Sequence, residues 1–105
     1  MPVAPKYMAD AAKQALEARE RVAPSRRAGT PVGLARARQL VNGTNLTTDT
    51  LLRMRSYLSR TEQAYRDAVA QGKDITTSKQ IMATGLWGGQ KGLEWVNREL
   101  KKLGL

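Results

Sequence analysis

Apolar positions along this chain recur at helical intervals of three and four residues, and no segment alternates in the way of a strand. The first apolar stripe consists of Met8, Ala12, Ala15 and Leu16. It predicts a helix from Lys6 to about Val22, ended by Pro24. Residues 1–5 are expected to form an extended lead, and residues 23–30, APSRRAGT, a flexible loop.

A second helix is expected to begin at Thr30-Pro31, where a capping hydroxyl precedes a proline in the first turn. Its predicted apolar face consists of Leu34, Ala37, Leu40 and Val41. Asn42-Gly43 is expected to end this helix, because glycine readily takes the left-handed conformation that follows a helix.

Thr47 is predicted to cap the next helix, with Leu46 packing onto Leu51 across the cap. Its stripe continues as far as Gln71, either as one long helix or with a break near residues 59–61. Two further helices are expected, one opened by Ile75-Thr76-Thr77-Ser78 and running to Trp87, the other from Gln90 to about Leu103. The pattern therefore predicts an all-α fold, a single compact domain of about five short helices over residues 1–105.

The stretch GLWGGQKGLEW, residues 85–95, holds four glycines and both tryptophans of the chain. It matches neither the phosphate-binding P-loop nor the dinucleotide fingerprint. We interpret its central Gly-Gly pair as a sharp turn between two helices, with Trp87 and Trp95 folding onto one core. Gly85 and Gly92 would let the helices approach closely.

Positive charge is concentrated in the first part of the chain. The protein has 18 Lys and Arg against nine Asp and Glu, a net charge of +9. Residues 1–60 carry 11 basic and four acidic side chains (net +7), and residues 61–105 carry seven and five (net +2). Such an excess favours an acidic partner, either nucleic acid or an acidic protein.

Seven arginines in this part of the chain form the candidate nucleic-acid-binding set, because the guanidinium fork suits phosphate oxygens. They are Arg26, Arg27, Arg36, Arg38, Arg53, Arg55 and Arg60. Helical geometry predicts that Arg36 and Arg53 project outward, and that Arg38 and Arg55 flank the core. No recognition helix, RNA-binding aromatic motif or zinc finger is present, so any binding is expected to be non-specific.

Candidate catalytic chemistry is sparse. The absence of Cys and His excludes disulfides, the usual zinc sites and Ser-His-Asp catalysis. Helical spacing predicts ion pairs that occupy three of the nine acids: Glu17–Arg21, Glu62–Arg66 and Glu94–Arg98. The three tyrosines, Tyr7, Tyr57 and Tyr65, are interpreted as residues at the edge of the core, with stacking platforms as the alternative. We therefore expect no enzyme, no catalytic residue, no metal and no cofactor.

Three segments together resemble a short module of tailed bacteriophages, which occurs as small separate proteins and within head-assembly proteins. They are TPVGLARARQL (residues 30–40), LTTDTLLRMRSYLSR (46–60) and LWGGQKGLEW (86–95). The chain departs from the module where Thr61 stands in place of a usual His, and where residues 72–78 replace a connection rich in Gly, Trp and Pro. The resemblance implies a phage protein in a virion- or DNA-associated setting, and no catalytic residues.

Two functional hypotheses follow. The first is a small basic phage protein that binds the phosphate backbone of nucleic acid without sequence specificity. The alternative is a virion structural or protein-interaction module that binds an acidic phage or host protein. No stretch approaches the roughly 18 apolar residues of a membrane span, so no membrane partner is expected. The expected location is the host cytoplasm or the virion.

Overall fold

The structure, a computed structural model, describes residues 2–105; Met1, the first residue of the expected lead, lies outside them. The described chain is all-α, as predicted, and contains no strand. Its elements are α1 (Lys6–Arg21), the 3-10 helix η1 (Pro24–Arg26), α2 (Pro31–Val41), α3 (Thr48–Arg60), α4 (Glu62–Ala70), α5 (Lys79–Leu86) and α6 (Gly92–Lys102).

Hydroxyl caps begin three of these helices, at Thr30 and Thr47 as predicted, and at Ser78, the last residue of the segment that was expected to open α5. The side chains of Thr30, Thr47 and Ser78 each accept a hydrogen bond from the backbone N–H three residues later, at 3.1 Å in every case. Each bond satisfies a donor that has no partner within its own helix. The N-termini of α2, α3 and α5 are therefore determined locally.

The sequence allowed either one long helix or a break near residues 59–61. The helix breaks at Thr61, so the described fold has six α-helices rather than five. Thr61 ends α3 and precedes α4. Its hydroxyl donates to the carbonyl of Tyr57, one turn earlier, at 2.7 Å. Such back-bonding by threonine bends a helix because it competes with the regular backbone hydrogen bond.

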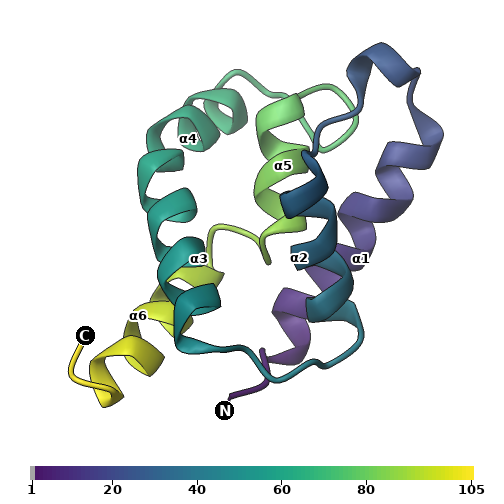
Figure 1. The fold of residues 1–105 in the computed structure, drawn as a ribbon. Helices are drawn as coiled ribbons and strands as arrows, with labels where there is room; N and C mark the ends of the chain where they lie inside the picture. The colour runs from purple at the N-terminus through teal and green to yellow at the C-terminus, as the bar shows by residue number, and fades with distance from the viewer. Residues whose placement is uncertain (1) are drawn as a thin grey trace.

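The helices form two groups that α5 joins (Figure 1). α1 packs against α2 and α5, α3 packs against α6, and α4 packs mainly against α5. In Figure 1, α3 and α4 follow one another as a bent column on the left, with α1 and α2 on the right and α5 between them. The radius of gyration is 13.1 Å, close to the value of about 13 Å expected for a folded domain of 100 residues.

The turn between α5 and α6 brings both tryptophans to the main core, as predicted. Gly88 and Gly89 have φ angles of 100° and 83°, which glycine adopts without strain. Trp87, before this turn, is 8% exposed, and Trp95, after it, packs on the same cluster while partly exposed. The main cluster consists of Met8, Ala12, Ala15, Ala37, Leu40, Leu46, Leu51, Met54, Leu58, Leu86, Trp87, Val96 and Leu100.

The segment expected to be a flexible loop, residues 23–30, contains η1 and is fastened at Ala28. This residue is buried; its N–H donates to the Met82 sulfur at 3.3 Å, and its carbonyl accepts from Arg19 Nε at 2.6 Å. The connection between α1 and α2 is therefore held to both α1 and α5.

One of the three predicted ion pairs is present. Glu62 and Arg66 approach to 3.2 Å. The predicted pairs at Glu17–Arg21 and Glu94–Arg98 are wrong, because neither forms within the described residues. Exposed helical pairs contribute only about 0.3–0.5 kcal/mol, too little for spacing alone to determine which of them form. The other observed pairs are Lys6–Asp10, Asp49–Arg53 and Glu99–Lys102.

Candidate nucleic-acid interface

One face of α3 carries two arginines around an aromatic side chain. Arg53, Ser56, Tyr57 and Arg60 stand at positions i, i+3, i+4 and i+7, so they share a face of the helix. Together with Trp87, at the end of α5, they line an open hollow of about 220 Å³. We call this the α3 hollow.

The aromatic side of the α3 hollow is a stacked pair. The rings of Tyr57 and Trp87 lie 4.7 Å apart between centroids, with an angle of 15° between their planes. Trp87 is buried and Tyr57 is partly buried. Burial raises the pKa of the Tyr57 phenol, against smaller opposing effects from its hydrogen bond with Gln80 and the charge of Arg60. The phenol oxygen accepts from Gln80 Nε2 at 3.4 Å.

Each ring of the pair also has a guanidinium over it. The Arg60 guanidinium carbon lies 5.7 Å from the Tyr57 centroid, and that of Arg36 lies 5.3 Å from the Trp87 centroid. Both distances fall within the roughly 6 Å range of cation–π attraction. The stacked pair thus joins an arginine of α2 to an arginine of α3.

Arg36 is buried, with 7% of its surface exposed. Its Nη1 donates to Gln39 Oε1 and, at 3.4 Å, to Thr50 Oγ1, whereas its Nε has no partner within residues 2–105. Burial and the positive charge of Arg53 lower the pKa of Arg36, and the carboxylate of Asp49 acts in the opposite direction. An arginine remains charged even so, which places a permanent positive charge behind the aromatic pair.

The prediction that Arg36 projects outward is wrong, and so is the prediction that Arg38 flanks the core, since Arg38 is exposed. The buried face of α2 is rotated from the predicted one, with Val41 40% exposed. Gly33 lies beside Trp87, since a Cβ there would be in van der Waals contact with the indole Nε1 at 3.4 Å. The ring therefore packs against this glycine, and Arg36, one turn later, covers it. The buried residues of α2 are Gly33, Arg36, Ala37 and Leu40.

Arg53 and Arg60 are the exposed charges of the α3 hollow. Arg53, which projects outward as predicted, pairs with Asp49 at 2.9 Å in an exposed ion pair. Arg60 forms no ion pair with any described residue. Three arginines against one nearby carboxylate, with Arg36 included, give this region a net positive charge.

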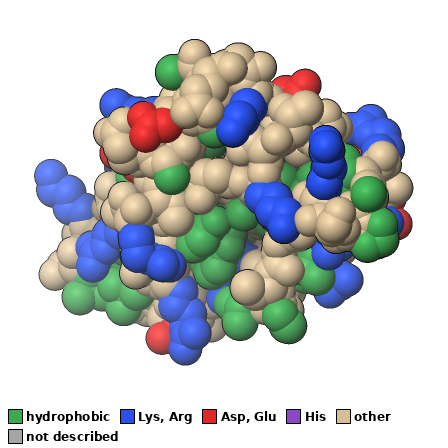
Figure 2. All heavy atoms as spheres, turned by 90° about the horizontal axis from the view of Figure 1, so that it is seen from above, with side chains coloured by type: hydrophobic (Ala, Val, Ile, Leu, Met, Phe, Trp, Pro, Cys, Tyr) green, Lys and Arg blue, Asp and Glu red, His purple; other side chains and the backbone are tan. Residues whose placement is uncertain are grey.

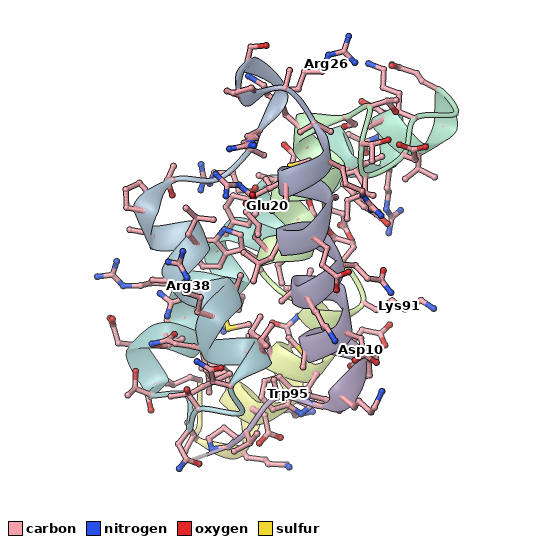
Figure 3. All side chains as sticks on the ribbon, turned by 90° about the vertical axis from the view of Figure 1, so that its right-hand side faces the viewer. Asp10, Glu20, Arg26, Arg38, Lys91 and Trp95 are labelled. Carbon is pink, nitrogen blue, oxygen red and sulfur yellow. The ribbon has the colours of Figure 1, made fainter. Side chains whose placement is uncertain are left out.

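The other four arginines of the candidate set lie elsewhere. Arg26 and Arg27 belong to the η1 connection, and Figure 3 shows Arg26 at one end of the molecule, far from Arg38 on the outer side of α2. Arg55, partly buried as predicted, donates to the carbonyl of Leu105 at 3.0 Å, beside the end of α6. The structure therefore brings together three of the seven arginines.

Basic side chains also dominate the face seen from above. Figure 2 shows a hollow lined by hydrophobic side chains, with Lys and Arg on either side of it and the few acidic side chains nearer the edge of the view. Such a surface attracts a polyanion over a range of about 10 Å at 0.1 M salt.

Acidic side chains within residues 2–105 form no group of three that could hold a metal ion. Asp74 has a structural role in a turn. Its carboxylate accepts hydrogen bonds from the N–H groups of Thr76 and Thr77, at 2.8 and 3.1 Å. Hydrogen bonds from these two threonines lower the pKa of Asp74. The bonds organise the turn that leads into α5.

A further hollow of about 850 Å³ lies between α4, the start of α6 and Tyr7. Tyr7 is exposed and Tyr65 is partly buried, so Tyr57 alone of the three tyrosines packs on the main core. The charges around this groove are balanced, with Glu62 and Glu94 facing Arg66 and Lys91. No described helix is long and apolar enough to cross a membrane.

The i, i+3, i+4, i+7 spacing in RMRSYLSR is the sequence signal for the α3 hollow. Sequence reasoning placed Tyr57 at the edge of the core and could not pair it with Trp87, 30 residues further on. Comparison with protein-family models, with curated proteins and with solved structures gave no match for this chain.

Proposed function

We propose that this all-α basic domain binds nucleic acid through its phosphate backbone, without sequence specificity, and that the α3 hollow is the centre of the binding surface. The observation that carries the proposal is the convergence of Arg36, Arg53 and Arg60 on the Tyr57–Trp87 pair. Two exposed guanidiniums flanking one hollow match the spaced negative charges of a phosphate chain.

The role of Arg36 in this proposal is electrostatic. Its guanidinium is too deeply buried to reach a phosphate, but its charge adds to those of Arg53 and Arg60. Screening by solvent is weaker for a buried charge than for an exposed one. The hollow thus retains positive potential even though Asp49 partly neutralises Arg53.

A salt titration with charge-matched variants tests the proposal. Binding of a mixed-sequence DNA is measured from low to physiological salt for the wild type, Arg53→Gln/Arg60→Gln and Arg26→Gln/Arg38→Gln. Both double variants lose two positive charges. The first is expected to bind more weakly and to reduce the salt slope by about 2, since each phosphate contact contributes about 0.9 to it. The control, Arg26→Gln/Arg38→Gln, should show a smaller loss of affinity and a smaller reduction of the salt slope.

Equal losses of affinity and of salt slope in the two double variants would show that DNA binds to the overall positive charge rather than to the α3 hollow. Absence of DNA and RNA binding by the wild type even at low salt would reject nucleic acid as the partner.

The groove beside Tyr7, Tyr65 and Leu93 supports the alternative, a protein-interaction module of the virion. Its size and its two tyrosines suit a protein surface. A partner that is retained after nuclease treatment, and lost on Leu93→Asp, would favour this function over the first.

The phage setting is part of the proposal. The three segments that carry the resemblance supply Arg36, the α3 face and Trp87, and these meet at one place in the fold. We therefore propose that the α3 hollow is the shared interaction site of the phage module, in a protein of the host cytoplasm or the virion.

A further inference from the structure

We propose that the α3 hollow selects single-stranded over double-stranded nucleic acid, by taking one unstacked base against Tyr57 while Arg53 and Arg60 hold the adjoining phosphates. This inference rests on the proposed function and deepens it. A surface that bound only phosphates would need no aromatic ring, yet Tyr57 lines the hollow together with Trp87.

The Tyr57 ring is available to a ligand once Arg60 moves. The ring is partly exposed, stacks on Trp87, and has the guanidinium of Arg60 over it. Arg60 is exposed and has no ion-pair partner in the described chain, so the Tyr57 ring is the group that its charge lies against. A guanidinium that moves from the ring to a phosphate leaves an aromatic surface for a base.

An aromatic ring in a hollow can be reached by a base of a single strand but not by a base inside a duplex. Bases inside a duplex have both faces covered by their neighbours, so their rings cannot reach an aromatic side chain in a hollow. An unpaired base in a single strand has a free face, and stacking on Tyr or Trp accepts any of the bases. The preference for single strands is therefore compatible with the absence of sequence specificity.

The volume of the α3 hollow suits part of a polymer better than a whole small molecule. The α3 hollow, at about 220 Å³, is open and smaller than the roughly 300–1,000 Å³ of ordinary small-molecule pockets. It suits one segment of a polymer that continues beyond it on both sides. Ser56, between the two arginines on the same helix face, adds a hydroxyl that can donate to a phosphate oxygen.

The rigid support behind Tyr57 completes the argument. Trp87 is buried between Tyr57 and α2, close against Gly33, with Arg36 over its ring. Arg36 is in turn held by Gln39 and Thr50. The platform for the base is thus preorganised, and only Arg60 has to move when a strand binds.

The test compares a single-stranded DNA of about 16 nucleotides with a hairpin whose stem pairs that sequence with its complement, at equal salt. The protein is the full chain carrying Trp95→Phe, which leaves Trp87 as its one tryptophan. We expect the single strand to bind roughly tenfold more tightly, the factor that stacking one base on an aromatic ring typically contributes. Only the single strand should quench the fluorescence of Trp87.

Variants at position 57 separate stacking from charge. Tyr57→Leu should bring the affinities for the single strand and the hairpin close to each other, and Tyr57→Phe should keep the preference for the single strand. Arg53→Gln/Arg60→Gln should weaken binding to both DNAs. Circular dichroism and thermal melting establish that each variant is folded; if Tyr57→Leu is not, the wild-type affinity ratio, the fluorescence and Tyr57→Phe still decide.

Equal affinity for the two DNAs, with unchanged Trp87 fluorescence, would overturn the inference and leave phosphate binding in place. A wild type that binds neither DNA would overturn both the inference and the proposed function.

Discussion

Gly85 of α5 lies against Ala15 of α1 so closely that a Cβ on Gly85 would be 2.9 Å from the Ala15 Cβ and 3.4 Å from the Ala11 carbonyl. Ala15 has no side-chain torsion with which to move away, so the contact determines how near the two helices can approach. The α1–α5 interface is the most extensive helix pairing in the fold.

Gly85→Ala should therefore destabilise the protein by about 1–3 kcal/mol, the usual cost of overpacking, even though alanine favours a helix by about 1 kcal/mol over glycine. Urea unfolding measures the change. The double variant Ala15→Gly/Gly85→Ala moves the methyl group across the interface and should recover part of the loss beyond additivity. An unchanged or increased stability of Gly85→Ala alone would mean that the helices separate easily.

Trp87→Ala is expected to lower the free energy of unfolding by about 3–5 kcal/mol, because it removes a buried ring from the main core and leaves a cavity. Trp95→Ala is the matched comparison. It should cost less, since the Trp95 side chain is only partly buried. Equal losses in the two variants would contradict the difference in burial.

Arg36→Ala should destabilise the protein by about 1–3 kcal/mol through the loss of its hydrogen bonds and of its contact with Trp87. Arg38→Ala, on the exposed side of the same helix, should change stability by no more than about 0.5 kcal/mol. Arg36→Met keeps the apolar stem and should fall between the two. An unchanged stability of Arg36→Ala would agree with the outward orientation that the sequence predicted.

Tyr57 gives the stability a dependence on alkaline pH. Burial raises the pKa of this phenol, so the folded state resists its ionisation. Its contribution is fully present below the unfolded pKa of about 10 and is lost as the pH rises through the folded value. Unfolding measured between about pH 9 and pH 11 should show a steeper loss for the wild type than for Tyr57→Phe. If the wild type and Tyr57→Phe lose the same unfolding free energy over this pH range, lysines and the other tyrosines account for the whole effect.

Local signals predicted most of the helix boundaries, because caps and turns depend on residues a few positions apart. Thr30, Thr47 and Ser78 each cap a helix within three residues of chain. The break at Thr61 was an open alternative because a threonine hydroxyl can bond back to the helix or to water. Periodicity alone does not decide between these partners.

The candidate site was less predictable, since its contacts join distant segments. A charged residue is ordinarily placed on the outside, whereas Arg36 is inside because it covers a ring that arrives from position 87. Neither the arginine nor the tryptophan reveals this partnership in the sequence. Charge counting did identify Arg53 and Arg60, but only as two among seven arginines.

The break at Thr61 also divides the α3–α4 column into two units of different local stability. Met54 and Leu58 of α3 are fully buried, whereas Ala68 is the only buried residue of α4. Opening α4 exposes little apolar surface, so its amide protons can exchange with solvent while the rest of the fold stays closed. Amides of α3 a few residues before Thr61 are expected to exchange more slowly, because this helix carries the buried side chains. We therefore expect the boundary between fast and slow amide exchange in the column to fall near Thr61.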